Sequence, residues 1–291
     1  MDSVIVLIAA PGSGAISPDV VARLGSAPRW LAESEAAEFS TLDVAAAKAA
    51  VAGLPIDVNQ VPLTNRRKKL LLADMDSTMI HQECIDELGV EAGVGDKIKE
   101  ITIRSMRGEI DFEGALRERV ALLKGLDETV IENLIRERIT FMEGGGTLLA
   151  TVKYHGAYTA LVSGGFTAFT AHVARFLGFD ENHANTLLIE NGKLTGEVSA
   201  PILGKQAKVE ALNHICSDRR LSAADVLAVG DGANDIPMLV AAGMGVALHA
   251  KPAVQEQARF VINHGDLTAL LYLQGYTASE FVRTKSHQGI A

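Results

Sequence analysis

The chain has 291 residues, of which 48% are hydrophobic and 22% are charged, and its formal net charge is −9. This composition excludes a disordered or fibrous chain, and the negative charge argues against nucleic acid as a partner because phosphate backbones repel it. The two cysteines, Cys84 and Cys216, form no CxxC pair, so we expect neither a disulfide framework nor a zinc site, as in a cytoplasmic protein. The apolar run at residues 4–8 follows Asp2 and is too short to span a membrane, so we expect a buried strand there.

The first part of the chain alternates between short strands and short helices. The predicted strands cover residues 3–9 and 56–61, with one or two more over residues 30–39. The predicted helices cover residues 18–24 and 41–52, the second capped by Ser40 or Thr41. A β-α-β-β-α-β order is that of a small ferredoxin-like sheet, so we predict an α+β domain over residues 1–65.

Four basic residues, Arg66, Arg67, Lys68 and Lys69, follow this domain. Runs of like charge are usually hydrated, because their members repel one another. We therefore interpret the cluster as a solvated, charged linker and not as a nucleic-acid site.

From Leu70 onward, short apolar runs end in polar or glycine-rich turns, which is typical of strands buried on both faces. The predicted strands cover residues 70–73, 158–162, 226–229, 245–248 and 260–262. The predicted helices between them cover residues 168–177, 205–215 and 236–242. This alternation predicts an α/β fold, a doubly wound, Rossmann-like parallel sheet over residues 66–81 and 144–291, with ligands beyond the carboxyl ends of the strands.

One long interval contains no good strand. Its predicted helices cover residues 82–88, 94–107, 112–123 and 128–138. Because this helical insertion directly follows the first strand of the sheet, we predict that residues 82–143 form a helical cap domain over the functional edge.

Asp74 and Asp76 directly follow the predicted strand at residues 70–73. In an extended segment, residues two apart point to the same side, so both carboxylates face one small volume. Hydrolysis of a phosphomonoester needs two such groups: one attacks phosphorus, and the other protonates the leaving oxygen and later deprotonates water. A strand end that runs into a helix cap is the alternative interpretation.

A second motif, Ser163-Gly164-Gly165, lies just past the next predicted strand. Its hydroxyl and its unshielded backbone N–H groups could approach phosphate oxygens closely, although a simple tight turn is the alternative. Lys208 lies on a predicted helix and could neutralise a phosphoryl group, whereas a solvated surface lysine is the alternative.

A third motif places Asp231, Asn234 and Asp235 after another predicted strand, unless it is only the capped start of a helix. Magnesium prefers oxygen ligands, and Asp74, the backbone carbonyl of Asp76 and Asp231 could supply three of them. All of these motifs lie at or beyond the carboxyl ends of strands in one predicted sheet. Such convergence is typical of an active site and not of scattered turns.

In this order, the motifs resemble those of the haloacid-dehalogenase superfamily across residues 70–265. Five segments are similar to the corresponding motifs of the phosphoserine phosphatases. They are DMDST, VSGGF, VGDGAND, NGKLTG at residues 191–196 and the segment 112–123. The resemblance implies magnesium-dependent hydrolysis of O-phospho-L-serine to L-serine and phosphate through an aspartyl phosphate, the last step of serine biosynthesis.

The resemblance also implies roles for the matched residues. Asp74 is expected to be the nucleophile and Asp76 the general acid and base. Magnesium is expected to be held by Asp74, the carbonyl of Asp76 and Asp231, with Asn234 and Asp235 supporting the site. Lys208 is expected to act in catalysis as well as in phosphate binding.

The residues expected to bind substrate are Glu83, Phe112, Arg119, Ser163, Gly164, Lys208 and Asn234. Phosphoserine carries an ammonium and a carboxylate besides its phosphate. Arg119 would bind the carboxylate with two hydrogen bonds, and Glu83 would pair with the ammonium. Without the resemblance, both residues would be interpreted as charges on a helix surface.

Three alternatives stay open at the level of sequence. A related phosphotransferase would pass the phosphoryl group from Asp74 to homoserine instead of water. A phosphatase for another small phosphomonoester, or an amino-acid sensor without catalysis, would use the same scaffold. The element order of residues 1–65 resembles ACT-type regulatory domains, which predicts either amino-acid sensing or pairing into a homodimer.

Overall fold

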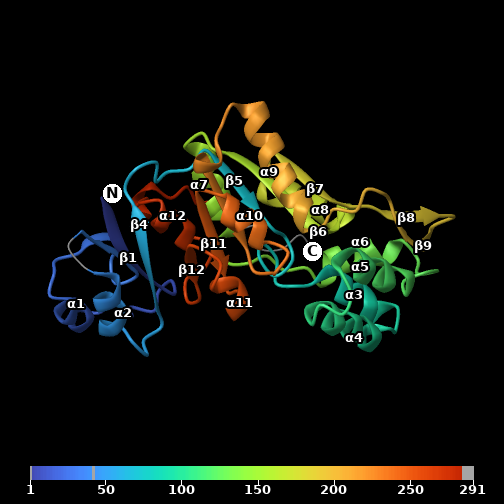
Figure 1. The fold of residues 1–291 in the computed structure, drawn as a ribbon, viewed down its shortest axis with the longest axis horizontal. Coiled ribbons are helices and arrows are strands. Elements are labelled where there is room, and N and C mark those ends of the chain that lie inside the picture. Colours follow the sequence, from blue (N-terminus) through green and yellow to red (C-terminus); the bar gives the residue numbers. More distant parts are fainter. Residues whose placement is uncertain (1, 41–42, 284–291) are drawn as a thin grey trace.

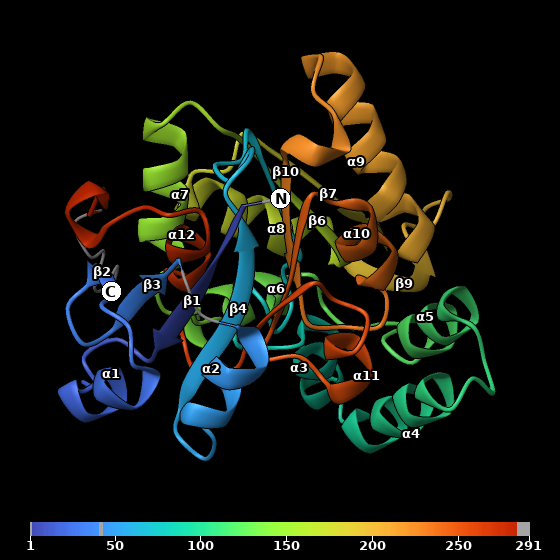
Figure 2. The same cartoon turned by 60° about the vertical axis from the view of Figure 1, so that its left-hand side comes forward.

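The computed structural model describes residues 2–40 and 43–283. Its N-terminal sheet has four antiparallel strands in the order β2-β3-β1-β4 (Figure 1 labels β1 and β4, and Figure 2 labels all four). The strands are β1 (Ser3–Ala9), β2 (Arg29–Ala32), β3 (Ala36–Phe39) and β4 (Ile56–Pro62). The helices are α1 (Pro18–Leu24) and α2 (Val44–Ala50), and they cover one face of the sheet. The ferredoxin-like arrangement expected from the sequence is present.

Helix α2 begins later than predicted. Asp43 is its N-cap, and its carboxylate accepts hydrogen bonds from the N–H groups of Ala45 and Ala46 at 3.0 and 3.1 Å. The prediction of Ser40 as the cap is therefore wrong, and Thr41 lies outside the described residues. Aspartate caps a helix as well as serine does, so composition alone did not discriminate between these neighbours.

The core is a parallel sheet of six strands in the order β12-β11-β10-β5-β6-β7 (Figure 1). The strands are β5 (Leu70–Ala73), β6 (Tyr158–Phe166), β7 (Glu181–Asn185), β10 (Val226–Gly230), β11 (Met244–Leu248) and β12 (Phe260–Ile262). Only β7 was not predicted, because its residues form no apolar run. The strand order reverses between β5 and β10, and ligands bind at such a switch point.

Helices cover both faces of this sheet, because successive side chains of a strand point to opposite faces. Leu71 and Ala73 of β5 belong to the hydrophobic cluster with α7, α8 and α12, whereas Leu70 and Leu72 belong to the cluster with α9 and α10. The helices of the core domain are α7 (Gly145–Tyr154), α8 (Thr167–Leu177), α9 (Lys205–Arg219), α10 (Ile236–Ala241), the short α11 (Pro252–Gln255) and α12 (Ala269–Leu273). The doubly wound fold predicted from the sequence is thus confirmed.

The interval between β5 and β6 is helical, as predicted. Its helices are α3 (Cys84–Glu91), α4 (Gly95–Met106), α5 (Phe112–Ala121) and α6 (Thr129–Glu137). They lie together at one end of the molecule, away from the N-terminal sheet (Figure 1). None of the helices in the described part of the chain is long and apolar enough to cross a membrane.

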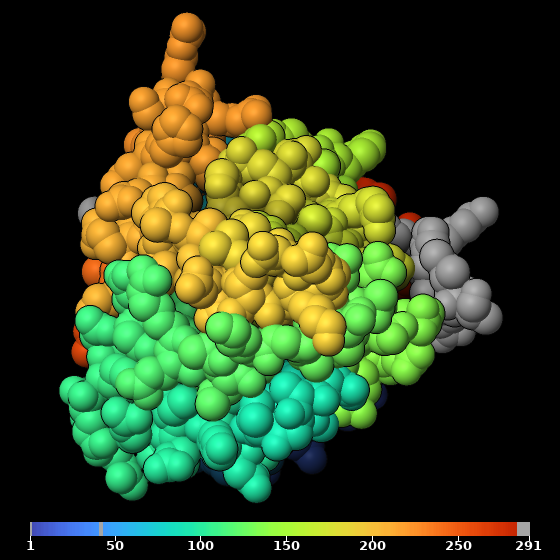
Figure 3. Space-filling view, turned by 90° about the vertical axis from the view of Figure 1, so that its right-hand side faces the viewer, coloured from blue at the N-terminus to red at the C-terminus, as the bar shows by residue number. Residues whose placement is uncertain are grey.

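A hairpin absent from the sequence prediction, β8 (Leu187–Glu190) and β9 (Lys193–Val198), lies against this helical cap (Figure 3). The Gly125 N–H donates to Leu194 O at 2.8 Å, and the Leu194 N–H donates to Leu126 O at 2.9 Å. Asn191 and Gly192 form the turn with φ of 52° and 76°, values that suit asparagine and glycine. An Asn-Gly pair between short strands is a strong local signal, so sequence reasoning could have found this hairpin.

The N-terminal sheet is fastened to the core by buried polar contacts as well as by apolar packing against α12, which lies beside β1 (Figure 2). Asn59 of β4 donates to Val261 O at 2.9 Å and accepts from its N–H at 3.0 Å. Asp57 accepts hydrogen bonds from the three successive N–H groups of residues 263–265 at 2.8, 3.0 and 3.0 Å. Both side chains therefore pair with backbone groups of β12 and the loop after it.

The basic cluster after β4 is part of this junction. The side chain of Arg66 is only 9% exposed, and its Nη1 lies 2.7 Å from Glu38 Oε2. Its Nε also donates to Leu273 O at 2.8 Å. The guanidinium of Arg67 lies over the ring of Tyr276, at 3.9 Å from its centroid. The interpretation of the cluster as a solvated linker is therefore wrong for Arg66, whose charge is paired inside the protein.

Candidate active site

The candidate residues meet at the switch point of the parallel sheet. Ala73 of β5 pairs with Val229 of β10, and the Asp74 N–H donates to Val229 O at 3.0 Å. Asp74 and Asp231 therefore leave neighbouring parallel strands at the same edge. The three predicted motifs converge as expected, with Ser163 in β6 on the other side of β5. The prediction that Ser163 lies just past the strand is wrong, because β6 continues to Phe166.

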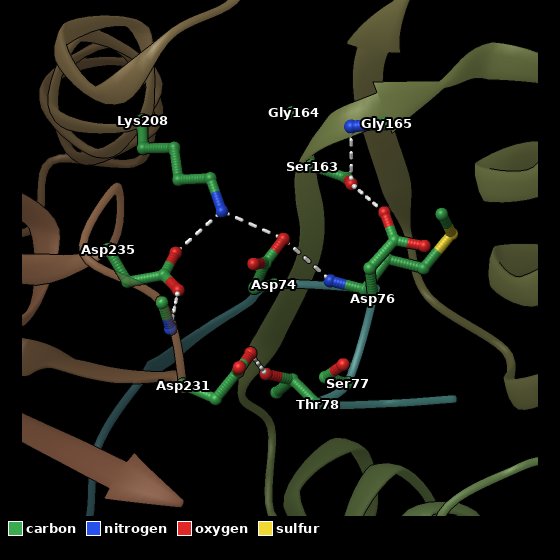
Figure 4. A network of polar contacts seen from close by, with 12 residues as sticks. Asp74, Asp76, Ser77, Thr78, Ser163, Gly164, Gly165, Lys208, Asp231 and Asp235 are labelled. Atoms are coloured by element: carbon green, nitrogen blue, oxygen red, sulfur yellow. Dashed lines mark hydrogen bonds and ion pairs between the residues drawn. The ribbon is translucent and has the colours of Figure 1, made fainter. Parts of the chain in front are cut away.

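Lys208 is the buried cation of the site. Its Nζ lies 2.7 Å from Asp74 Oδ1 and 2.5 Å from Asp235 Oδ1 (Figure 4). Burial alone favours the neutral amine, but the charges of Asp235 and Asp74 outweigh it and raise the pKa of Lys208. The lysine is therefore charged at every physiological pH, and its alternative interpretation as a solvated surface residue is wrong.

Asp74, Asp231 and Asp235 each offer a carboxylate oxygen within 4.8 Å of the others. Burial and the charge of Asp235 raise the pKa of Asp231 to about 6, and they raise the pKa of Asp74 well above its usual range. Lys208 opposes both shifts, but one ammonium does not balance three carboxylates. A hard divalent cation with oxygen ligands fits this cluster. The sequence had assigned Asp235 only a supporting role.

Asp76 lies beside the cluster with different partners. Its Oδ2 accepts a hydrogen bond from Ser163 Oγ at 3.3 Å, and its Oδ1 accepts one from the Cys84 N–H at 3.0 Å (the former drawn in Figure 4). Burial raises the pKa of Asp76, although Cys84, Lys208 and Ser163 oppose the shift. A carboxyl group biased in this way toward its acid form can protonate a leaving oxygen. The metal-ligand role predicted for the Asp76 carbonyl stays a prediction.

The two glycines after Ser163 allow neighbouring side chains to approach the backbone closely. A Cβ at Gly165 would lie 2.6 Å from Asp76 Oδ2, and one at Gly164 would lie 2.9 Å from Phe112 Cζ. A side chain at either position would force the side chain of Asp76 or Phe112 to move, so glycine suits both positions. Asn234 Nδ2 lies on the same side of Gly164, at 3.8 Å from that Cβ position. The turn thus runs between the cap phenylalanine and the third motif.

The cap contributes Glu83, the N-cap residue of α3, and Arg119, in the last turn of α5. Burial and the charge of Asp76 raise the pKa of Glu83 to about 7. Burial lowers the pKa of Arg119, and the charges of Asp86 and Glu83 oppose this shift. The two predicted substrate residues therefore share one electrostatic environment with Asp76, and a zwitterionic ligand suits such a pair.

Two contacts around the site had no counterpart in the sequence analysis. Thr78 Oγ1 donates to Asp231 Oδ1 at 3.0 Å and so orients a carboxylate of the acidic cluster (Figure 4). Lys251 Nζ lies 3.8 Å from Met106 Sδ and joins the loop after β11 to the cap. Thr78 could have been suspected because it follows the first motif directly. No local signal connects Lys251 with Met106, which lies 145 positions earlier.

Comparison with known proteins agrees with this geometry. The family model described as haloacid dehalogenase-like hydrolase matches residues 71–240, a range that includes Asp74, Ser163, Lys208 and Asp231. The chain belongs to the haloacid dehalogenase-like hydrolase family. Within this class, curated relatives named phosphoserine phosphatase are similar to it.

The phosphoserine phosphatase of Haemophilus influenzae is 46% identical over 204 residues, which cover 70% of this chain and 65% of the relative. This chain thus spans just under two thirds of that relative's length. The phosphoserine phosphatase of Lactococcus lactis subsp. lactis is also 46% identical over 204 residues, 70% of this chain and 94% of the relative. The crystal structure of a HAD family hydrolase from Salmonella enterica subsp. enterica serovar Typhi superimposes with a TM-score of 0.82 at 28% identity, covering 93% of this chain and 98% of that one.

Proposed function

We propose that this chain is a magnesium-dependent phosphatase that hydrolyses O-phospho-L-serine to L-serine and phosphate. The observation that carries the proposal is the buried contact of Lys208 Nζ with Asp74 Oδ1, at 2.7 Å, on the edge of the sheet covered by the helical cap. A nucleophilic carboxylate next to a fixed cation is suited to attack on a phosphoryl group. The names of the similar curated proteins support the choice of substrate.

In the proposed reaction, Asp74 attacks phosphorus in line with the serine oxygen. The P–O bond to serine breaks as the new bond forms, and Asp76 gives its proton to the departing oxygen. Water then attacks the phosphorus of the phosphoaspartate while Asp76 takes a proton from it, which releases phosphate and restores Asp74. The raised pKa of Asp76, caused by burial, supports its role as the acid in the first step.

The same residues stabilise charge during both steps. Lys208 lies against Asp74 and would neutralise the equatorial oxygens of the transferring group. The Ser163 hydroxyl and the Gly164 N–H would bind these oxygens, as glycine-rich turns do. Asp74, Asp231 and the carbonyl of Asp76 would hold magnesium, with Asn234 and Asp235 supporting the site, and the ion when bound supplies further neutralisation of the phosphate charge.

The cap would select the amino-acid end of the substrate. Arg119 would bind the carboxylate, and Glu83 would pair with the ammonium group. Phe112, whose Cζ lies 2.9 Å from the Cβ position of Gly164, would close over the bound molecule and exclude water. Glu83 suits this role because a positive ligand would relieve the repulsion that it receives from Asp76.

The test is release of phosphate from L-phosphoserine with magnesium and with EDTA, for the wild type, Asp74→Asn and the surface control Asp218→Asn. The expected result is magnesium-dependent release that Asp74→Asn abolishes and Asp218→Asn retains. Added homoserine should leave the products unchanged, and formation of phosphohomoserine would identify a phosphotransferase instead. A folded, magnesium-loaded protein that releases no phosphate would contradict the proposal and favour the amino-acid sensor.

We also propose three coarser features of the whole protein. Its domains would be residues 1–65, the core at 66–81 with 144–291, and the cap at 82–143. The free, buried thiols of the two cysteines suit a reducing cytoplasm. The N-terminal, ACT-like sheet ends in the edge strand β2, which could pair with a second copy to form a homodimer. Light scattering of the purified protein would test the dimer, and limited proteolysis would test the boundaries.

A further inference from the structure

The segment that joins the first core strand to the cap closes on itself. The Cys84 N–H donates to Asp76 Oδ1 at 3.0 Å, and the Ser77 N–H donates to Gln82 O at 3.2 Å. Ser77 Oγ donates to Glu83 Oε1 at 2.8 Å. Residues at the two ends of a short loop are thus held together, so the first motif and the start of α3 form one compact unit.

Ser77 adopts an unusual backbone conformation at the centre of this unit. Its φ is 53°, in the left-handed region that residues other than glycine rarely occupy. Such a conformation persists only where the surrounding structure holds it, and it is frequent at ligand-binding sites. In this conformation the hydroxyl reaches across the loop to the carboxylate of Glu83.

Electrostatic repulsion disfavours the orientation of the Glu83 side chain toward the site. Glu83 lies next to the negative charges of Asp76, Asp231 and Asp86, which all repel its carboxylate. The Ser77 hydroxyl offers a compensating hydrogen bond to one oxygen, Oε1, and leaves the other oxygen of Glu83 for a ligand.

From this geometry we infer that Ser77 is a positioning residue for substrate selection, because it orients Glu83 toward the ammonium group of the substrate. The inference rests on the proposed function, which assigns Glu83 to that group. The inference assigns phosphoryl transfer and substrate selection to different residues. Asp74 and Lys208 act on any bound phosphate, whereas Ser77 acts through Glu83 only when an ammonium group is present. Loss of the hydroxyl should therefore weaken the preference for amino-acid phosphates and leave phosphoryl transfer intact.

The experiment compares kcat/KM for L-phosphoserine with that for 3-phosphooxypropanoate, in which hydrogen replaces the amino group. The variants are Ser77→Ala and Ser77→Gly, the second of which accepts a φ of 53° without strain, and the control is Ser217→Ala on the surface of α9. Both Ser77 variants should lose about tenfold in kcat/KM for phosphoserine, the order of one hydrogen bond to a charged group, and little for the analogue. The control should retain both values.

A double-mutant cycle with Glu83→Gln tests whether Ser77 acts through Glu83. In the Glu83→Gln protein, removal of the Ser77 hydroxyl should not reduce the preference further. An equal loss for both substrates, or an unchanged preference in both Ser77 variants, would overturn the inference while the proposed function stands. A wild type without preference for phosphoserine would overturn the proposed substrate itself, and the inference with it.

Discussion

The N-terminal junction and the candidate active site both bury carboxylates, but they differ in how far the negative charge is compensated by neighbouring groups. At the junction, Glu38 lies between Arg66 and Arg29, and Asp57 accepts three backbone hydrogen bonds. At the active site, the buried ammonium of Lys208 faces a cluster of three carboxylates. The first arrangement compensates each negative charge, and the second leaves an excess.

The pKa values follow this difference. Burial opposes the shift, but the hydrogen bonds and charges of Arg66 and Arg29 lower the pKa of Glu38. Burial and the charge of a neighbouring carboxylate raise the pKa values of Asp74 and Asp231. Paired charges of the first kind hold elements together, whereas an uncompensated cluster is available to a cation and a substrate. The balance of charge, and not burial, therefore distinguishes the structural region from the functional one.

The largest effect is expected from Lys208→Met, which removes the ammonium that is buried between Asp74 and Asp235. We expect kcat/KM for phosphoserine to fall by about 10³-fold or more, because the transferring phosphoryl group loses its fixed counter-charge. Circular dichroism should report a folded protein. Lys205→Met, an exposed position at the start of α9, is the matched control and should retain activity. Activity of Lys208→Met within roughly tenfold of the wild type would refute the assigned role.

At the junction, Asp57→Ala should reduce stability and leave the chemistry unchanged. Three N–H groups of residues 263–265, one of them fully buried, would lose their acceptor, so we expect a loss of about 3 kcal/mol in the free energy of unfolding by urea. The folded fraction should keep its kcat. Asp218→Ala on the surface is the control. If Asp57→Ala lowered kcat without lowering stability, the junction would belong to the functional region and the comparison would fail.

Magnesium should stabilise the active-site region through its excess of carboxylates. At about 100 times its Kd, the ion should add about 2.7 kcal/mol to the free energy of unfolding, which a thermal melt detects without any substrate. The shift in Tm should be lost in Asp231→Asn, which removes one member of the acidic cluster, and kept in Asp218→Asn. Equal shifts in both variants would place the binding of magnesium elsewhere.

The smallest effect is expected from Glu38→Gln, and it should depend on pH. A lowered pKa means that ionised Glu38 contributes stability fully above its unfolded value of 4.5, and that this contribution is lost as the pH falls through the lower folded value. The variant should therefore be about 1–2 kcal/mol less stable than the wild type at pH 7, with a smaller difference in acid. Glu33→Gln, in an exposed turn, is the control. A difference that stays constant with pH would argue against the pairing.

Much of the fold was accessible from local patterns. Apolar runs predicted the strands β5, β6, β10, β11 and β12, and the helical interval predicted the cap, because hydrophobic periodicity reflects which face of an element is buried. The short strand β7 lacks that pattern, and the hairpin β8–β9 was missed although its Asn-Gly turn is a local signal.

The sequence by itself determined that the candidate catalytic residues lie at one edge of the sheet. Asp74, Ser163 and Asp231 each follow an apolar run, and parallel strands place their carboxyl ends on one edge. It did not determine which charges are paired. Arg66 looked solvated beside three other basic residues, and Asp57 carried no signal, because its partners lie 206 to 208 positions away. Only the tertiary structure decided these contacts, since burial and hydrogen bonding between distant segments set the state of a charge, whereas the order of elements follows from neighbours in the chain.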